Sequence, residues 1–284
     1  MIANRFKPGT ISKMRTLFRF EQQNVNWKLG DYSKQTNAFA YGLCEARIQP
    51  GAKALFWLDE NHSIETTMAA VGCFKAGVSV KALSNQITDP AELLKQINKE
   101  NPDILIFSPN QKISSENKLN LLNRTFSDLA SNKSHKPLKL KANESIKHII
   151  QTGFYEKKGT VKFRDFLLYR DQNMSSLSTL SFKDKVEALF QKDDKALDSI
   201  KPEDYVFYAG SMDNLSTLQR VIVGSSLSGY VVNILSSNVA EKANLNFIND
   251  LEREAKCHIL VNEKNEKLLK ERVTHVGANF VKVG

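Results

Sequence analysis

One stretch of the sequence combines residue types that could hold a phosphate group. It runs from Gly210 to Arg220 and follows a short apolar run, Tyr205 to Tyr208, that predicts a strand. A phosphate-binding loop needs glycines for positive φ and close backbone approach, hydroxyls that reach the phosphate oxygens, and often a lysine. The residues of the stretch that bear on this potential, for or against, are Gly210, Ser211, Asp213, Asn214 and Arg220.

The carboxylate of Asp213 makes this stretch a poor phosphate site. It would repel a triphosphate by Coulomb's law, and the charge of Arg220 offsets only part of that repulsion. After Gly210 the stretch also has no further glycine to give the backbone donors their geometry. We therefore predict that the stretch binds no nucleotide cofactor and contributes no catalytic residue.

Histidine, cysteine and serine residues form no catalytic or metal-binding pattern in the sequence. There is no CxxC or Cys/His cluster, and the five histidines have no local carboxylate partner in a recognisable pattern. His148, alone on a predicted strand, is interpreted as a packing residue. Ser225 lies in VGSSLSG, which is not a nucleophile elbow. Cys44 and Cys73 fall on the predicted core faces of helices, and with Cys257 they are predicted to be small buried hydrophobes. We expect no metal site, no disulfide and no catalytic residue.

The elements that must position these residues alternate between helix and strand. From Trp27 to Phe107 the apolar periodicity switches repeatedly from helical spacing to compact runs. The expected elements are a helix containing Ala38, Phe39, Leu43 and Ala46, a strand from Ala54 to Leu58, a helix capped by Asn61 and ended by Gly77, a strand from Val78 to Leu83, a helix from Pro90 to Asn98, and a strand from Ile104 to Phe107. This order predicts a layered α/β domain.

The same region resembles the N-terminal part of the adenylate-forming superfamily, which includes acyl-CoA synthetases, luciferases and the adenylation domains of peptide synthetases. The matching scaffold positions, in the family's order, are Tyr32, Asn37, Ala40 and Leu43, then Pro50 and Gly51, Asn61, the run Lys75, Ala76 and Gly77, and Leu83. Later segments, SIKHIIQTG from Ser145 and GTVKFRDFLL ending at Leu168, are also similar to the family pattern. The resemblance implies an α/β layered sheet-and-helix fold like the N-terminal subdomains of acyl-CoA synthetases.

The resemblance weakens where the family performs chemistry. Its ATP-binding loop reads T-S-G-T-T-G-x-P-K-G-V, whereas this chain continues from Ser211 with Met212, Asp213 and Asn214 and has Ser216, Thr217 and Leu218 at the Pro-Lys-Gly positions. We therefore interpret Gly210 to Arg220 as a vestigial nucleotide loop. The family's downstream acidic motifs and its small C-terminal domain with a catalytic lysine have no counterpart before Gly284. These departures predict a degenerate and truncated member.

The net charge of +9 is concentrated in two regions. Residues 1–20 contain five basic side chains and no acidic one: Arg5, Lys7, Lys13, Arg15 and Arg19. Such a composition is typical of a mitochondrial transit peptide, and equally of a basic extension. We predict that residues 1–26 form a basic N-terminal arm, which could be an uncleaved targeting segment and a contact segment for a partner or a membrane surface. Ile11, Met14, Leu17 and Phe18 allow a one-sided helix in it.

The second basic region predicts a surface insertion. Residues 110–170 contain thirteen basic and five acidic side chains, and within 110–143 a string of leucines indicates one short helix. A solvated loop explains the run from Lys133 to Lys141 better than a nucleic-acid site, because no aromatic residue interleaves it. Residues 171–200 are interpreted as a connector, and residues 27–284 as one acyl-CoA-synthetase-like α/β domain. No apolar run approaches the length of a membrane span.

The sequence thus favours a non-catalytic protein with an interaction role. Because site residues are lost on a retained scaffold with basic appendages, we expect an accessory subunit of a large mitochondrial assembly, first of all a respiratory or ATP synthase complex, at the matrix or the matrix face of the inner membrane. Three alternatives stay open. The first is a part of a split acyl-activating enzyme whose missing segments come from a partner, and the second is a mitochondrial ribosome-associated protein. The third is a module that holds an acyl chain or nucleotide without turnover, which predicts a closed apolar pocket near Gly224 to Val232.

Overall fold

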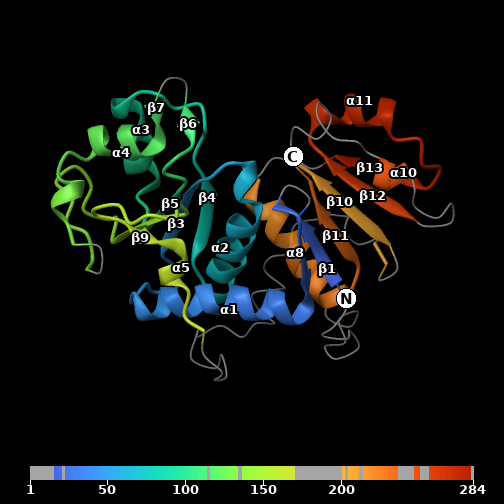
Figure 1. Ribbon diagram of the computed structural model, residues 1–284, viewed down its shortest axis with the longest axis horizontal. Coiled ribbons are helices and arrows are strands. Elements are labelled where there is room, and N and C mark those ends of the chain that lie inside the picture. The colour runs from blue at the N-terminus through green and yellow to red at the C-terminus, as the bar shows by residue number, and fades with distance from the viewer. Residues whose placement is uncertain are drawn as a thin grey trace. The chain divides into compact units, whose positions relative to one another are not determined.

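The computed structural model describes residues 16–20, 23–113, 116–133, 136–169, 200–201, 204–210, 214–235, 246–249 and 256–282. Its contacts divide the chain into two compact units. Unit 2 is continuous and covers 35–180, whereas unit 1 combines 1–34 with 181–284. Each unit is built on its own largely parallel sheet with helices against it (Figure 1). The layered α/β fold is confirmed, and the region 27–284 that the sequence describes as one domain contains parts of both units.

Unit 2 contains a five-stranded parallel sheet in the order β4-β3-β5-β8-β9. Its strands are β3 (Lys53–Trp57), β4 (Ser79–Ala82), β5 (Ile104–Phe107), β8 (His148–Gln151) and β9 (Val161–Lys162). Its helices are the greater part of α1 (Leu29–Glu45, whose first residues belong to unit 1), α2 (Ser63–Ala76), α3 (Pro90–Glu100), α4 (Lys118–Thr125) and α5 (Phe163–Phe166). Short turns η3 (Glu60–His62) and η4 (Leu129–Ser131) and a small hairpin of β6 (Lys112–Ile113) and β7 (Glu116–Asn117) complete it. The predicted helices and strands between residues 29 and 107 are therefore present.

Of the three helix-end residues that the sequence predicts in α2 and α3, two are confirmed and one is wrong. Pro90 begins α3 behind an Asp89 cap, and Gly77 ends α2 in the left-handed conformation with φ +73°. The sequence predicts that Asn61 caps α2, and this prediction is wrong, because the helix starts at Ser63 and its N-cap position is His62. Asn61 instead lies in η3, where its backbone N–H donates to the carboxylate of Asp59.

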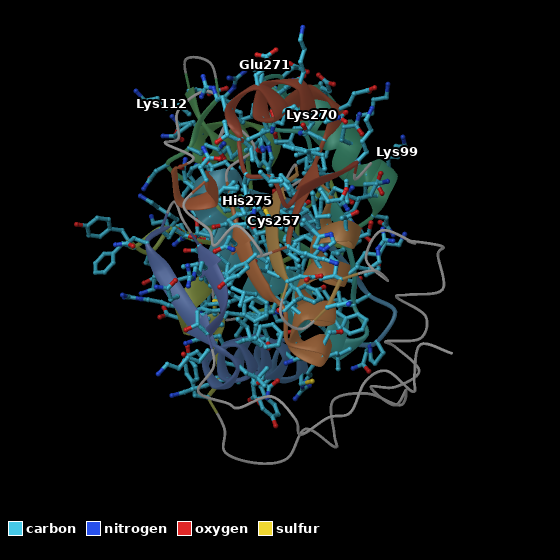
Figure 2. All side chains as sticks on the ribbon, turned by 90° about the vertical axis from the view of Figure 1, so that its right-hand side faces the viewer. Lys99, Lys112, Cys257, Lys270, Glu271 and His275 are labelled. Carbon is cyan, nitrogen blue, oxygen red and sulfur yellow. The ribbon has the colours of Figure 1, made fainter. Side chains whose placement is uncertain are left out.

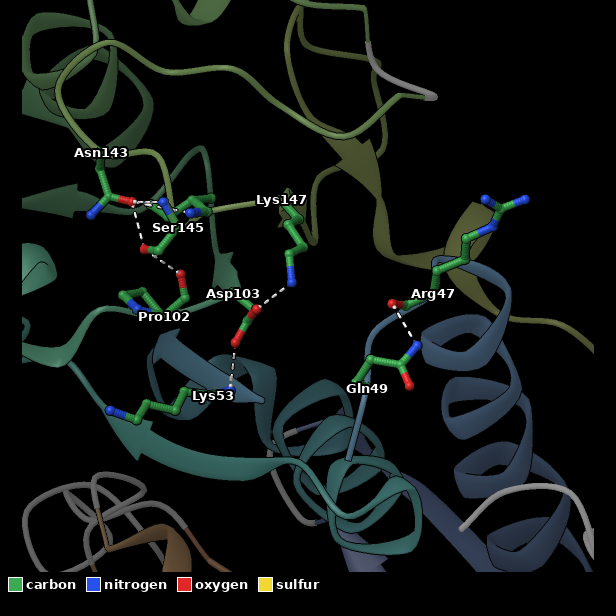
Figure 3. A network of polar contacts seen from close by, with 9 residues as sticks. Arg47, Gln49, Lys53, Pro102, Asp103, Asn143, Ser145 and Lys147 are labelled. Atoms are coloured by element: carbon green, nitrogen blue, oxygen red, sulfur yellow. Dashed lines mark hydrogen bonds and ion pairs between the residues drawn. The ribbon is translucent and has the colours of Figure 1, made fainter. Parts of the chain in front are cut away.

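A polar network fixes the amino ends of three neighbouring strands (Figure 3). The carboxylate of Asp103 accepts from the Lys53 backbone N–H at 3.0 Å and pairs with the Lys147 ammonium at 2.7 Å. Beside it, the side-chain oxygen of Asn143 accepts from the backbone N–H groups of Ser145 and Ile146, at 3.1 and 3.0 Å. These bonds satisfy donors that lie ahead of β3 and β8, so the strands start in register.

The basic region 110–143 is not a surface insertion. Leu121, Leu122, Phe126 and Leu129 are fully buried and belong to one core with strands β3 and β5 and helix α3. The exposed face of this segment is rich in lysine and asparagine, so its overall composition is polar and does not indicate that its other face is buried. The segment is a structural layer of unit 2.

Unit 1 contains a six-stranded sheet in the order β13-β12-β10-β11-β1-β2. Its strands are β1 (Thr16–Phe20), β2 (Val25–Lys28), β10 (Tyr205–Ala209), β11 (Val231–Ile234), β12 (Cys257–Val261) and β13 (Ala278–Lys282), and all neighbours pair in parallel except β1 and β2. Its described helices are α8 (Leu215–Ser228), α10 (Asn246–Asn249) and α11 (Glu263–Arg272). One face of β10 and β12 forms a core with Ile248 and Leu269.

The sequence predicts a basic N-terminal arm over residues 1–26, and this prediction is wrong for the described residues from Thr16 onward. Strand β1 lies inside the sheet between β11 and β2, and its residues Leu17, Phe18 and Phe20 are fully buried. A strand with this burial excludes the one-sided helix over the same residues, and Arg19 is a solvent-facing strand residue and not part of a detached arm. Arg5, Lys7, Lys13 and Arg15 lie outside the described residues.

Several other predictions are settled or left open by the described residues. The connector at 171–200 lies almost entirely outside them. Cys73 and Cys257 are buried as predicted, but Cys44 is exposed, because it lies on the outer side of α1. Within the described part, no helix combines the length and apolar character needed to cross a membrane.

Candidate functional site

The vestigial loop connects β10 to α8, and its second half is helical. Helix α8 begins at Leu215, so Ser216, Thr217 and Leu218 form its first turn where the family pattern places Pro-Lys-Gly. The side chain of Asn214 caps this turn by accepting from the Thr217 backbone N–H at 3.2 Å. One of the helix donors that could hold an anion is therefore satisfied by the chain itself.

Two more residues of the loop have local structural roles. A Cβ on Gly210 would stand 2.8 Å from the ring of Tyr208, so the glycine allows the close approach of that ring. The guanidinium of Arg220 lies along its own helix, 3.4 Å from the Ser216 carbonyl oxygen and 3.4 Å from the Thr217 hydroxyl. Ser211 and Asp213 lie outside the described residues. The described members Gly210, Asn214 and Arg220 thus start and pack a helix.

Two histidines do have carboxylate partners, which the sequence prediction missed. His62 Nδ1 lies 2.5 Å from an Asp59 oxygen, and His258 Nε2 lies 3.0 Å from an oxygen of the buried Asp204. The spacing of three residues was the available signal for the first pair. The second pair is brought together only by the register of β10 and β12, in which Val206 faces His258. His148 is buried in unit 2 beside Phe166, in agreement with its predicted packing role.

The pair of Asp59 and His62 lies just beyond the carboxyl end of β3, near a buried lysine. Lys118 begins α4, is fully buried, and donates from Nζ to the Trp57 carbonyl oxygen at 2.7 Å and to Asn85 Oδ1 at 2.6 Å. Burial alone would raise the pKa of the Asp59 carboxyl, but the hydrogen bond and charge of His62 and the charge of Lys118 hold that pKa below its usual value. The arrangement is an ordered electrostatic cluster with both signs of charge.

Burial is the main cause of the pKa shifts of two other titratable groups, Cys257 and His148. Figure 2 labels Cys257 and His275 in unit 1. Burial raises the pKa of the Cys257 thiol to about 12, so the nucleophilic thiolate is not formed near neutral pH. Burial also lowers the pKa of His148. Among the described residues, no group of three or more His, Cys, Asp or Glu side chains is placed to hold a metal ion.

The partly buried amine of Lys75 predicts a specific pH dependence of stability. Lys75 Nζ donates to the Thr36 hydroxyl at 2.6 Å and to Asn37 Oδ1 at 2.7 Å, and desolvation lowers its pKa from 10.5 to about 7. Between these pH values the unfolded chain binds more protons than the folded chain. The free energy of unfolding should therefore rise from pH 7 toward pH 10, by about 2 kcal/mol after allowance for residual solvent contact.

Urea titrations of the wild type and of Lys75→Met across this pH range would measure the effect. The rise should disappear in Lys75→Met and persist in Lys99→Met, which changes an exposed lysine. Parallel curves for wild type and Lys75→Met would show that the Lys75 amine does not titrate in this range.

Comparison with known proteins identifies the fold. No protein-family model matches the sequence, and no curated protein matches it either. Many solved structures do match, and they include acyl-CoA ligases and a luciferase-like enzyme. The chain therefore has the fold of the N-terminal portion of adenylate-forming acyl-CoA ligases, which confirms the resemblance at the level of fold.

Three of these structures define the extent of the similarity. ATP-bound MatB from Rhodopseudomonas palustris superposes with a TM-score of 0.65 at 14% identity, covering 99% of this chain and 54% of that one. Coronafacic acid ligase from Pectobacterium brasiliense gives 0.61 at 15% identity, with coverage of 95% and 52%. A benzoate CoA ligase from Burkholderia xenovorans gives 0.59 at 12% identity, with coverage of 99% and 59%. The chain thus spans between 52% and 59% of the length of these three proteins.

Proposed function

We propose that this protein is a non-catalytic accessory subunit of a large mitochondrial assembly, built on an acyl-CoA-ligase-like fold. A respiratory or ATP synthase complex is the first candidate. The observation that carries the proposal is the conversion of the nucleotide loop into the start of α8, where Asn214 caps the Thr217 N–H. A folded scaffold whose ligand loop serves its own helix is suited to presenting surfaces to other subunits.

The residue types of the loop support the same interpretation. The sequence of the loop includes the carboxylate of Asp213, which would repel a triphosphate, and Arg220 is turned along its own helix. The proposed location is supported by composition, because residues 1–20 are basic and contain no acid.

The proposal predicts that the full chain does not bind ATP. Isothermal titration of Mg-ATP and of a non-hydrolysable acyl-adenylate analogue should show no saturable heat at concentrations that saturate an intact acyl-CoA ligase. Asp213→Gly removes the repelling carboxylate as a paired variant. Because the helical turn at 216–218 remains, we expect the Asp213→Gly variant not to bind ATP either. Saturable ATP binding by either protein would contradict the proposal.

A split acyl-activating enzyme is the second candidate. It is favoured by the retention of both ligase-like units over 99% of the chain in the MatB superposition. Purification of tagged protein from mitochondria separates the candidates. Recovery with respiratory or ATP synthase subunits supports the first, recovery with a chain that restores ATP-dependent acyl transfer supports the second, and recovery with mitochondrial ribosomes supports a ribosome-associated role. Recovery only as a free monomer would contradict all three.

A further inference from the structure

The loop between β8 and β9 presents two adjacent aromatic rings to solvent. Phe154 is 68% exposed and Tyr155 is 72% exposed. Their ring centroids lie 5.3 Å apart with the ring planes nearly perpendicular. Single exposed apolar side chains are common on proteins, but two neighbouring rings form a small apolar surface that water solvates poorly.

The backbone on both sides of the rings is anchored to the core of unit 2. The fully buried Gln151 donates from its side-chain amide to the Tyr155 carbonyl oxygen at 2.9 Å. On the other side, the Thr160 hydroxyl donates to the Lys157 carbonyl oxygen at 2.8 Å. Gly159 has φ +73°, and a Cβ there would stand 2.2 Å from the Leu129 carbonyl oxygen. The exposure of the rings is therefore set by an ordered loop.

One basic side chain contacts the Phe154 ring, and others follow the rings in the loop. The guanidinium of Arg164, on α5, lies 4.7 Å from the centroid of the Phe154 ring, a cation–π distance. Lys158 is exposed and Lys157 is half-buried. The acidic groups nearby are Glu156 and Asp165, and Asp165 pairs with Lys162 at 2.9 Å and with Arg164 at 3.4 Å. The four basic side chains of residues 154–165 exceed the two acidic ones.

We propose that residues 154–158 together with Arg164, the aromatic-basic loop, dock on an anionic lipid bilayer. The apolar ring of Phe154 and the amphipathic ring of Tyr155 suit the boundary between acyl chains and headgroups, while lysine and arginine contact lipid phosphates. The net positive charge complements such a surface. A convex pair of rings on an anchored loop suits a deformable bilayer, since it requires no matching hollow. The inference is independent of ATP binding, because none of these residues belongs to the nucleotide loop.

Vesicle binding of the full chain tests this inference. Phe154→Trp places a reporter on the loop, against the two native tryptophans, Trp27 and Trp57, which are buried. Its emission should shift to shorter wavelength with phosphatidylcholine vesicles that contain phosphatidylserine, and the shift should weaken as salt is raised. Flotation should show binding of the wild type that falls about tenfold or more in Phe154→Ser/Tyr155→Ser, and about tenfold in Lys157→Glu/Lys158→Glu.

Matched controls make the result specific. Lys95→Glu/Lys99→Glu makes the same change of charge at two exposed sites on α3, where Figure 2 labels Lys99, and should bind about half as well as the wild type or better. Circular dichroism should be unchanged in every variant, and native tryptophan fluorescence should be unchanged in every variant that adds no tryptophan, which excludes misfolding. Absence of binding to anionic vesicles, or equal binding after loss of both rings, would overturn the inference. Binding to a polyglutamate column with the same loop dependence but not to vesicles would assign the surface to an acidic protein instead.

Discussion

Lys118→Ala should lower the free energy of unfolding by about 3 to 5 kcal/mol. The side chain is fully buried, and its ammonium donates to two core acceptors, the Trp57 carbonyl oxygen and Asn85 Oδ1. The ammonium also lies 4.9 Å from the centroid of the Trp57 ring. Truncation removes the stem from a close-packed core and leaves both oxygens with one donor fewer. Urea denaturation followed by tryptophan fluorescence measures the loss.

The matched variants separate the contributions to this loss. Lys112→Ala removes an exposed lysine from the hairpin that precedes α4 and should change stability by less than about 0.5 kcal/mol. A double-mutant cycle of Lys118→Ala with Asn85→Ala should give a coupling energy of about 1 to 2 kcal/mol, because the two side chains share one hydrogen bond. A loss below about 1 kcal/mol for Lys118→Ala would show that the ammonium is not held in the core.

Deletion of residues 1–20 should prevent unit 1 from folding. It removes β1, an internal strand that pairs with β11 on one side and β2 on the other. Phe18 and Phe20 are fully buried, and their rings lie 4.8 Å from those of Tyr32 and Trp27. Loss of three buried apolar side chains costs about 6 to 12 kcal/mol, which is as much as the whole stability of a typical domain.

The control for this deletion is a shorter one, of residues 1–15, which keeps all of β1 and should leave unit 1 folded. Limited proteolysis should cut unit 1 rapidly in the longer deletion and leave a protected fragment of unit 2 in both. The same reasoning limits any targeting role of the N-terminus. If the protein is processed, mass spectrometry should place the mature N-terminus at or before Thr16. A soluble, protease-resistant unit 1 in the longer deletion would contradict the assignment of β1 to the core.

The sequence predicts those elements well whose signal is local. Pro90 and the apolar run Ile104 to Phe107 identify α3 and β5, because a helix start and a buried parallel strand each have a compact signature. Strand β1 was missed because it is only five residues long and its apolar residues also fit helical spacing. Its pairing with β11 depends on a partner far away in the chain.

The candidate sites show the same limit. The loss of glycines from the nucleotide loop can be read directly, whereas the helical state of residues 215–218 and the cap by Asn214 required the structure. Lys118 occurs in the segment 110–143, which the sequence predicts as a surface insertion, because nothing local indicates that Trp57 and Asn85 accept hydrogen bonds from its ammonium. Likewise, aromatic residues such as Phe154 and Tyr155 are often buried, and the sequence alone does not indicate that both rings are exposed on an anchored loop.

The interleaved order of the two units determines the sequence of events during biosynthesis. Strand β1 is synthesised first, but its parallel partner β11 is completed only after the whole of unit 2 has been made. Unit 2 is continuous and can fold while the chain is still growing, whereas Leu17, Phe18 and Phe20 must wait without their partner strand. We therefore expect mispairing of β1 to be most frequent in the interval between the synthesis of β1 and that of β11.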